Sequence, residues 1–309
     1  MPNNSGIVIC ATGSRYDVLD SVSGEKVECR IRGKLRLKGS RSTSPVVVGD
    51  RVSYEIDKTG EAVITDISER QNYIIRRSSN LSKESHIIAA NIDQAFLVVT
   101  LHSPKTSFEF IDRFLVTSAA YKIPATIILN KVDTLEDYTD ELENFMRVYS
   151  LAGYEIIKTC ALDLTGISEI KDRLKDKTSL FSGNSGVGKS SLIRAIEPST
   201  NAKVGEISSS HNKGKHTTTY STVYTLSEGG FIIDTPGIKG FGLIDIATEE
   251  LYRYFPDIMK YSHDCKFYNC THLHEPGCAV ERAIVEGKIS IERYESYLKI
   301  LEEDGKHRK

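Results

Sequence analysis

Two short segments of the sequence carry residue types that bind nucleotides. In the quartet Asn130-Lys131-Val132-Asp133, the Asp133 carboxylate can accept hydrogen bonds from N1–H and from the exocyclic amine of guanine, donors that adenine lacks. Residues 183–190 match the pattern Gly-x4-Gly-Lys-Ser, in which backbone N–H groups cradle phosphates. By chance alone, the first would be a polar loop and the second a glycine-rich turn. Both follow predicted strands, where open α/β sheets bind ligands, and this favours a nucleotide site.

Residues 183–191 have expected partners on the nucleotide. Lys189 should reach the β and γ phosphate oxygens, and the Ser190 hydroxyl should ligate magnesium. The helix that this loop opens presents its first N–H groups to the phosphates. The residues that we expect to contact the nucleotide are Gly183, Asn184, Ser185, Gly186, Val187, Gly188, Lys189, Ser190 and Ser191, together with Asn130, Lys131 and Asp133.

A second strand end offers a magnesium and γ-phosphate contact. Asp234 closes the apolar run FIID and can hold magnesium through water, while the Gly237 N–H can sense the γ-phosphate. Upstream, the segment GKHTTT at 214–219 offers threonine hydroxyls to the metal, with Thr218 and Thr219 as the candidates. Taken alone, the first segment would also fit a hairpin-exit turn and the second a polar loop.

A weaker signal follows the strand after the quartet. The segment Thr159-Cys160-Ala161 stands where a backbone N–H, of Cys160 or Ala161, would contact the guanine carbonyl oxygen. The order of all these segments is unusual, because the base-reading quartet precedes the phosphate loop by about fifty residues. Cutting the domain after Asp-Thr-Pro-Gly and joining its former ends gives this order. Domain termini commonly lie close together, so a sheet tolerates such a circular permutation.

Three of the six cysteines lie within fourteen residues near the C-terminus. With one histidine they offer three thiolates and an imidazole, the donor set of a closed tetrahedral zinc site. His272 and His274 are both candidates for the fourth ligand, and buried reduced cysteines without a metal are the simpler alternative. A closed site leaves no position for water, so the predicted zinc ion is structural. The candidate ligands are Cys265, Cys270, His272 and Cys278.

The composition is that of an ordinary globular protein, with 39% hydrophobic and 27% charged residues in 309 positions. We find no apolar run long enough to cross a membrane and no export signal at the N-terminus, so we expect a cytoplasmic protein. A net charge of −2 means that nucleic-acid binding needs a local basic patch. The segment RIRGKLRLK at 30–38 is such a patch, because its five cations share one parity and would line one face of a strand. That face could bind phosphates or simply be solvated.

The predicted elements change character along the chain. Five β-rich segments within residues 1–75 suit a small barrel of the oligonucleotide-binding (OB) type. From about residue 90 strands alternate with helices, which predicts an α/β domain with a mainly parallel sheet at 76–244. Residues 245–309 are expected to be helical around the cysteines. Residues 197–219 are rich in Ser, Gly, Lys and Thr, and we expect a mobile loop there.

These motifs together resemble the RsgA type, the ribosome small-subunit-dependent GTPases of bacteria, whose GTPase domain is circularly permuted. The resemblance covers nearly the whole chain and includes VVVGDRV, AANIDQAFLV, NKVD, GNSGVGKSSL, GKHTTT, DTPGIKGFGL, CKFYNCTHLHEPGCAV and ERYESYL. It implies an OB barrel at 1–75, a permuted GTPase domain at 76–244 and a zinc module at 245–309. It also favours His272 over His274 as the zinc ligand. Cys160 stands where serine is commoner, which leaves a backbone contact little affected.

The resemblance implies a monomeric GTPase that acts with the small ribosomal subunit and its rRNA in late maturation. Ile238 follows Asp-Thr-Pro-Gly where many GTPases place a water-orienting glutamine, so we expect slow turnover unless a partner orders the 197–219 loop. His216 is the nearest titratable candidate to position water. Two other functions compete: an RNA-binding scaffold that does not hydrolyse GTP, against which Lys189, Ser190 and Asp234 argue, and a P-loop kinase or ATPase, against which NKVD argues.

Overall fold

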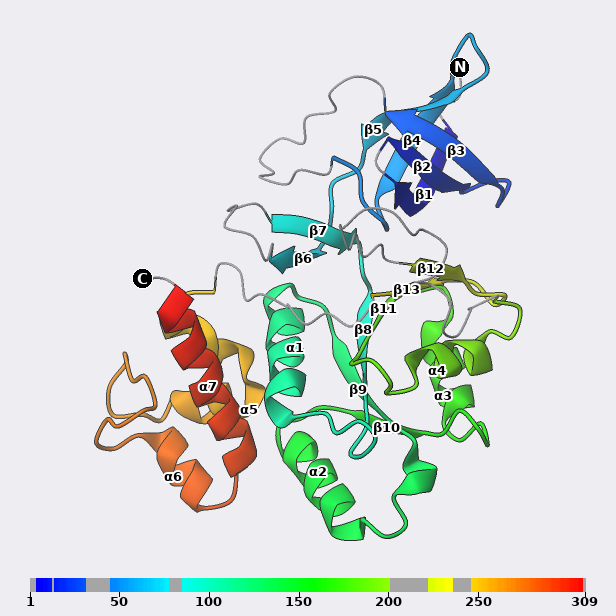
Figure 1. Ribbon diagram of the computed structural model, residues 1–309. Helices are drawn as coiled ribbons and strands as arrows, with labels where there is room; N and C mark the ends of the chain where they lie inside the picture. Colours follow the sequence, from blue (N-terminus) through cyan, green and yellow to red (C-terminus); the bar gives the residue numbers. More distant parts are fainter. Residues whose placement is uncertain are drawn as a thin grey trace.

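The computed structural model describes residues 4–12, 14–31, 45–77, 85–200, 222–235 and 246–307. Its elements form an N-terminal barrel, a short two-stranded sheet, a six-stranded sheet with helices on both faces, and a C-terminal helical region (Figure 1). The barrel lies at one end of the molecule, and the C-terminal helices pack beside α1 (Figure 1). The two predicted fold classes, a β-barrel and a mainly parallel α/β sheet, are confirmed.

The N-terminal barrel is closed, with its strands in the order β1-β2-β3-β5-β4. Only β3 and β5 pair in parallel; β4 pairs with β1 and completes the circle. Alternate residues such as Val18, Tyr54 and Ile64 point inward and form an apolar core. This is the arrangement predicted for the five β-rich segments. The strands are β1 (Asn4–Thr12), β2 (Arg15–Asp20), β3 (Lys26–Ile31), β4 (Arg51–Ile56) and β5 (Ala62–Ile67).

An antiparallel pair that we did not predict, β6 (Tyr73–Arg77) with β7 (Ser85–Ala90), leads from the barrel to the main sheet. The barrel segment before β4 pairs with β7 through a bridge between Val48 and Ala89. Asn91 donates a side-chain hydrogen bond to the Gly49 carbonyl (2.9 Å). A backbone bridge and the Asn91 side chain therefore tie the barrel to the segment that leads into the main sheet.

The main sheet has the strand order β10-β9-β8-β11-β13-β12, and only the edge pair β12–β13 is antiparallel. Parallel strands end at the same edge, so the segments that come after β8, β9, β10, β11 and β13 meet there. The strands are β8 (Gln94–Val99), β9 (Ala125–Asn130), β10 (Ile156–Thr159), β11 (Thr178–Ser182), β12 (Thr222–Thr225) and β13 (Phe231–Asp234).

Helices cover both faces of this sheet, in two separate apolar clusters. One face packs Leu97 and Val99 against the first two helices; the other packs Phe96 and Val98 against the next two. Every second residue of a strand thus belongs to a different layer. The helices are α1 (Phe108–Ala120) and α2 (Thr139–Leu151) on the first face and α3 (Ile167–Leu174) and α4 (Lys189–Ile196) on the second, with a 3-10 turn, η1 (Val132–Thr134), after β9.

The C-terminal region has its own apolar cluster, which also includes Val116 of α1. Asp112 and Val116 lie one helical turn apart and face this region, while Ile111, Phe114 and Leu115 face the sheet. Helix α1 is therefore buried on two sides. The elements of the region are η2 (Thr248–Tyr254), α5 (Pro256–Ser262), α6 (Ala279–Val285) and α7 (Ile291–His307).

Gly49 should be essential for the junction between the barrel and the sheet. Its φ is +87°, and a Cβ at this position would lie 2.0 Å from the Ala90 carbonyl oxygen. We expect Gly49→Ala to lower the free energy of unfolding by at least about 2 kcal/mol, because a strained backbone adds to a backbone clash. Gly24, whose φ is +69° and whose Cβ would meet nothing within 4 Å, is the matched control. Denaturant titration checks both; equal losses in Gly49→Ala and Gly24→Ala would contradict the packing argument.

Candidate nucleotide site and metal centre

The carboxyl edge of the sheet gathers the predicted nucleotide-binding segments. The quartet 130–133 begins at the end of β9, and residues 159–161 begin at the end of β10. The phosphate loop comes after β11, and Asp234 ends β13. Between β9 and β11 lies β8, which pairs in parallel with both. Segments that are far apart in the chain thus lie on one edge of the sheet.

The phosphate loop needs its glycines for close approach. A Cβ on Gly183 would lie 2.4 Å from the Val98 carbonyl oxygen, and one on Gly188 would lie 2.4 Å from the Asn130 side-chain nitrogen. Gly188 is also the N-cap of α4 and has a φ of +92°. No side chain caps this end of α4 in the described structure, so its first N–H groups remain available to an anion.

Lys189, at the start of α4, and Asp234, at the end of β13, form an ion pair. The Lys189 ammonium lies 2.8 Å from an Asp234 carboxylate oxygen, and both side chains are largely buried (12% and 15% exposed). The strand register explains the pairing, because Phe181 of β11 stands beside Asp234 of β13. The predicted phosphate ligand and the predicted magnesium partner therefore occupy one small volume.

Asn130 and Lys131 contact the phosphate loop, a role that sequence reasoning had not separated from base binding. The Asn130 amide donates to the Val187 carbonyl oxygen (2.8 Å) and accepts from the Thr159 hydroxyl (3.0 Å). The Lys131 ammonium donates to the Gly186 carbonyl oxygen (2.8 Å). Within the quartet, this leaves Asp133 as the exposed polar side chain that can face a base.

The loop between β8 and α1, residues 100–107, is a part of the site that we did not predict. The Lys131 ammonium also donates to the Ser103 carbonyl oxygen (2.6 Å). Pro104 lies against Gly186, where an added Cβ would be 3.4 Å from its ring. The Thr100 hydroxyl donates to the Pro104 carbonyl and fixes the loop. The sequence signal that could have indicated this loop was its position directly after a buried strand, since such loops meet at the carboxyl edge of the sheet.

Cys160 is buried (1% exposed), and burial raises the pKa of its thiol. Its backbone N–H donates to the Thr165 carbonyl oxygen at 3.1 Å. That N–H is therefore already engaged within its own loop. Of the two predicted backbone contacts to guanine, Ala161 is the better candidate.

Several predicted residues lie outside the described part of the chain: His216, Thr218, Thr219, Gly237 and Ile238, and, in the basic segment, Arg32, Lys34, Arg36 and Lys38. Of the basic segment, Arg30 and Ile31 are described. Arg30 forms an ion pair with Glu61, the residue just before β5, at 3.1 Å. Its charge is thus partly neutralised within the barrel, while the other four cations of the predicted face lie outside the described residues.

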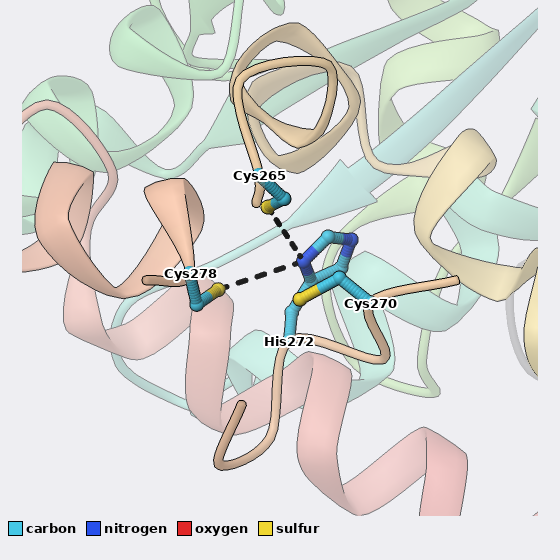
Figure 2. Close-up of side chains that lie close together, drawn as sticks. All are labelled: Cys265, Cys270, His272 and Cys278. Carbon is cyan, nitrogen blue, oxygen red and sulfur yellow. Dashed lines mark hydrogen bonds between the residues drawn. The ribbon is translucent and has the colours of Figure 1, made fainter. Parts of the chain in front are cut away.

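The predicted zinc ligands converge (Figure 2). All four candidate ligand atoms lie within 4.8 Å of one another. His272 Nδ1 lies 3.6 Å from the Cys265 sulfur and 3.7 Å from the Cys278 sulfur. In a tetrahedral site with Zn–S of about 2.3 Å and Zn–N of about 2.0 Å, sulfur and nitrogen would be about 3.5 Å apart, close to the distances seen here. Cys265, Cys270, His272 and Cys278 thus form a potential zinc site.

Backbone N–H groups and tyrosines support this cluster. The N–H of Ala279 donates to the Cys265 sulfur (3.4 Å), and the N–H of Glu281 donates to the Cys278 sulfur (3.5 Å). From α7, the Tyr294 hydroxyl donates to the His272 carbonyl oxygen (2.6 Å), and the Tyr297 hydroxyl donates to the Thr271 carbonyl oxygen (3.0 Å). The two N–H groups that donate to sulfur favour the thiolate form that a metal requires, and the two tyrosines hold the backbone that carries His272.

The two histidine candidates differ sharply. His272 is 2% exposed and its Nδ1 faces the sulfurs, whereas His274 is exposed. Burial raises the pKa of the Cys270 thiol to about 12 and lowers the pKa of His272. Three neighbouring thiolates therefore need a cation close by, while a neutral imidazole is already favoured. A cation beside the thiolates and a neutral imidazole are both what zinc binding by the three cysteines and His272 requires.

Comparison with known proteins gives a consistent result along the chain. The family model for the RsgA N-terminal domain matches residues 5–64, and that for the RsgA GTPase matches residues 67–244. The small ribosomal subunit biogenesis GTPase RsgA 2 of Bacteroides thetaiotaomicron is 54% identical over 306 residues, covering 98% of each chain. The small ribosomal subunit biogenesis GTPase RsgA of Flavobacterium johnsoniae is 49% identical, covering 98% of this chain and 94% of that protein.

Two solved structures share the whole architecture. YjeQ from Thermotoga maritima superposes with a TM-score of 0.79 at 36% identity, covering 97% of this chain and 98% of that one. YloQ, described as a circularly permuted GTPase, has a TM-score of 0.74 at 32% identity, with coverages of 99% and 96%. The rotated order of nucleotide motifs and the N-terminal barrel agree with these matches, and the chain belongs to the RsgA family of circularly permuted GTPases.

Proposed function

We propose that this protein binds the small ribosomal subunit and hydrolyses GTP to GDP and phosphate during late maturation of that subunit, which stimulates the hydrolysis. The observation that carries the proposal is the junction of quartet, phosphate loop and Asp234 at one sheet edge. Relatives with about half of their residues identical are named small ribosomal subunit biogenesis GTPases. The direct test is GTP turnover with added small subunits, large subunits or bare RNA; equal rates in all three would refute the subunit dependence.

The reaction is an in-line attack of water on the γ-phosphate, and the chain's own groups orient and neutralise the phosphates. Lys189 holds the β and γ oxygens, and N–H groups of the phosphate loop and of Gly237 bind the remaining oxygens. Ser190 and Thr218 would hold magnesium directly and Asp234 would hold it through water. When bound, magnesium neutralises charge that develops on the phosphates. In the structure Lys189 and Asp234 already lie 2.8 Å apart, which fits a shared phosphate–magnesium site.

Two residues shape the rate in this proposal. Ile238 cannot orient water, so intrinsic turnover is slow. His216 lies in the predicted mobile loop and is our candidate for positioning the attacking water, or for ordering that loop, when the subunit is bound. Thr219, in the same segment, is a second candidate contact to the nucleotide.

Guanine selectivity rests on Asp133 and on one backbone group. Asn130 and Lys131 hold the phosphate loop, so Asp133 alone of the quartet reads the base edge. Its carboxylate accepts from two guanine donors, and the Ala161 N–H contacts the guanine carbonyl. A site that relies on such hydrogen bonds rejects analogues without them by about 10⁴ or more.

We assign the barrel and its basic segment to rRNA contact, residues 76–244 to nucleotide hydrolysis and residues 245–309 to a zinc-stabilised module, in a monomeric cytoplasmic protein. The barrel fold and the cations Arg32, Lys34, Arg36 and Lys38 support the first assignment. The helices in the described ranges are too short or too polar to cross a bilayer.

Asp133→Asn should move base preference from guanine toward xanthine, because the amide donates a hydrogen bond where the carboxylate accepted one. We expect GTP affinity to fall by at least about 100-fold, with a compensating gain for XTP. Competition between GTP and XTP for a labelled nucleotide measures both. A variant with unchanged GTP selectivity would show that Asp133 does not read the base.

Reversing Arg32, Lys34 and Arg36 to Glu should weaken subunit binding and leave nucleotide affinity unchanged. Each lost phosphate contact should flatten the dependence of log affinity on log salt by about 0.7 to 0.9. Arg30→Glu is the matched control, because Arg30 is already paired with Glu61. Sedimentation binding assays across a salt series provide these slopes. An unchanged slope in the triple variant would mean that the basic face is solvated and binds no phosphate.

His272→Ala should lose zinc, whereas His274→Ala should keep one ion per chain, because only His272 faces the sulfurs. Removing zinc should also unfold the module, since a structural site contributes about 10–16 kcal/mol of apparent binding free energy. Zinc content by elemental analysis and helix content by circular dichroism test this. Full zinc occupancy in His272→Ala would exclude that residue as a ligand.

A further inference from the structure

Arg293 is the largest fully buried side chain in the described structure. Its guanidinium pairs with Asp257 of α5 through two nitrogens (2.9 and 3.1 Å) and with Asp112 of α1 through the third. Neither carboxylate is more than 4% exposed. The rings of Phe255 and Tyr154 lie 4.7 and 5.4 Å from the guanidinium carbon and exclude water around it.

Stability alone does not account for this arrangement. Replacing a buried ion pair by apolar side chains of similar volume is often neutral or stabilising, so burial of three charges is weak evidence for a stability role. A planar guanidinium bound through both edges does fix the angle between its partners. Here those partners are α1, which packs on the sheet, and α5 and α7 of the C-terminal region (Figure 1).

Helix α1 leads directly to the nucleotide site. Asp112 stands in the second turn of α1, and Ser107 caps the helix by accepting from the Phe110 N–H (3.3 Å). The preceding loop is fixed by hydrogen bonds between Thr100 and Thr106 (3.0 and 3.2 Å). That loop places the Ser103 carbonyl on Lys131, which in turn holds the phosphate loop. A tilt of α1 would therefore displace one wall of the nucleotide site.

The same helix that carries Arg293 also holds the zinc loop. Tyr294 and Tyr297 of α7 donate hydrogen bonds to backbone carbonyls of His272 and Thr271. The zinc cluster is thus connected to Arg293 through one turn of α7, and Arg293 is connected to the phosphate loop through α1. A continuous series of direct contacts thus runs from the zinc cluster to the phosphate loop. Its last two contacts are the hydrogen bonds from Lys131 to the Ser103 and Gly186 carbonyl oxygens (2.6 and 2.8 Å).

We propose that Arg293 is a positioning residue for the nucleotide site: by fixing α1 against the C-terminal region, it holds the loop at 100–107 against Lys131 and the phosphate loop. The proposal rests on the nucleotide site proposed above. If Arg293 acts in this way, nucleotide binding and docking of the C-terminal region against α1 depend on each other. Nucleotide binding favours the docked C-terminal region, and a docked region favours nucleotide binding by the same factor.

The test measures GDP and non-hydrolysable GTP-analogue affinity, with kcat and KM for GTP, in the full-length protein without ribosomal subunits. We expect Arg293→Met to weaken both affinities about tenfold, within the usual range of such couplings, and Asp112→Asn to weaken them less. Arg293→Lys, which can keep one ion pair, should recover part of the loss. Hydrogen exchange should show faster exchange at residues 100–107 in Arg293→Met.

Arg70→Met is the matched control. Arg70 also forms a largely buried ion pair, with Asp50 at 2.7 Å, but at the barrel junction near the amino end of β8, away from the nucleotide edge. It should lower the melting temperature without changing nucleotide affinity. Parent-like nucleotide affinity in a folded Arg293→Met protein would overturn the proposal, and if that variant does not fold, parent-like affinity in Asp112→Asn would do so.

Failure of the nucleotide assignment itself is distinguishable. Lys189→Ala should abolish binding of the triphosphate if the phosphate loop is the site, whatever Arg293 does. Zinc removal from the parent protein should lower nucleotide affinity as Arg293→Met does. Zinc removal from the Arg293→Met variant should lower its affinity little further, because zinc and Arg293 both act through α7. An additive effect of the two changes would mean that zinc and Arg293 act separately, against the proposed series of contacts.

Discussion

The hydrogen bond from the Asn130 amide to the Val187 carbonyl joins the two halves of the nucleotide site. Its donor ends β9 and its acceptor lies in the loop after β11, and these two strands are not neighbours in the sheet. Both pair in parallel with β8, so Leu97 stands beside Ile127 on one side and Ser182 on the other. This double register sets where each strand ends. The site depends on the neighbours in the sheet, and the order of its parts along the chain can rotate without loss.

Much of this could be predicted because the signals are local. Strand TSLFS before a glycine-rich loop, or three cysteines and a histidine in fourteen residues, carry their chemistry in short stretches. The β6–β7 pair lies at the boundary between two predicted domains, where we predicted no strands. The junction through Gly49 and Asn91 was missed because it joins residues 42 positions apart in the chain. No side-chain periodicity indicates such contacts.

Charged residues were the hardest to place from sequence. Arg30 belongs to the alternating basic pattern, yet it pairs with Glu61, which directly precedes β5. Arg293 lies in a polar stretch, IERYES, that is typical of a solvent-exposed helix, yet it is completely buried. In each case the partner carboxylate comes from another part of the chain. Whether a cation faces water, phosphate or a buried acid is therefore decided by tertiary structure, which local pattern does not contain.

The permutation also explains why the C-terminal region can pack beside α1. Among the described residues, no further strand of the sheet comes after β13, so the chain beyond Asp234 can leave the phosphate edge. By Ile246 it has joined the apolar cluster that contains Val116 of α1. Closing a short connection between these two points costs entropy that grows only slowly with its length, and the shared apolar cluster offsets that cost. The region that comes after Asp234 of β13 thus packs against α1, whose preceding loop contacts Lys131.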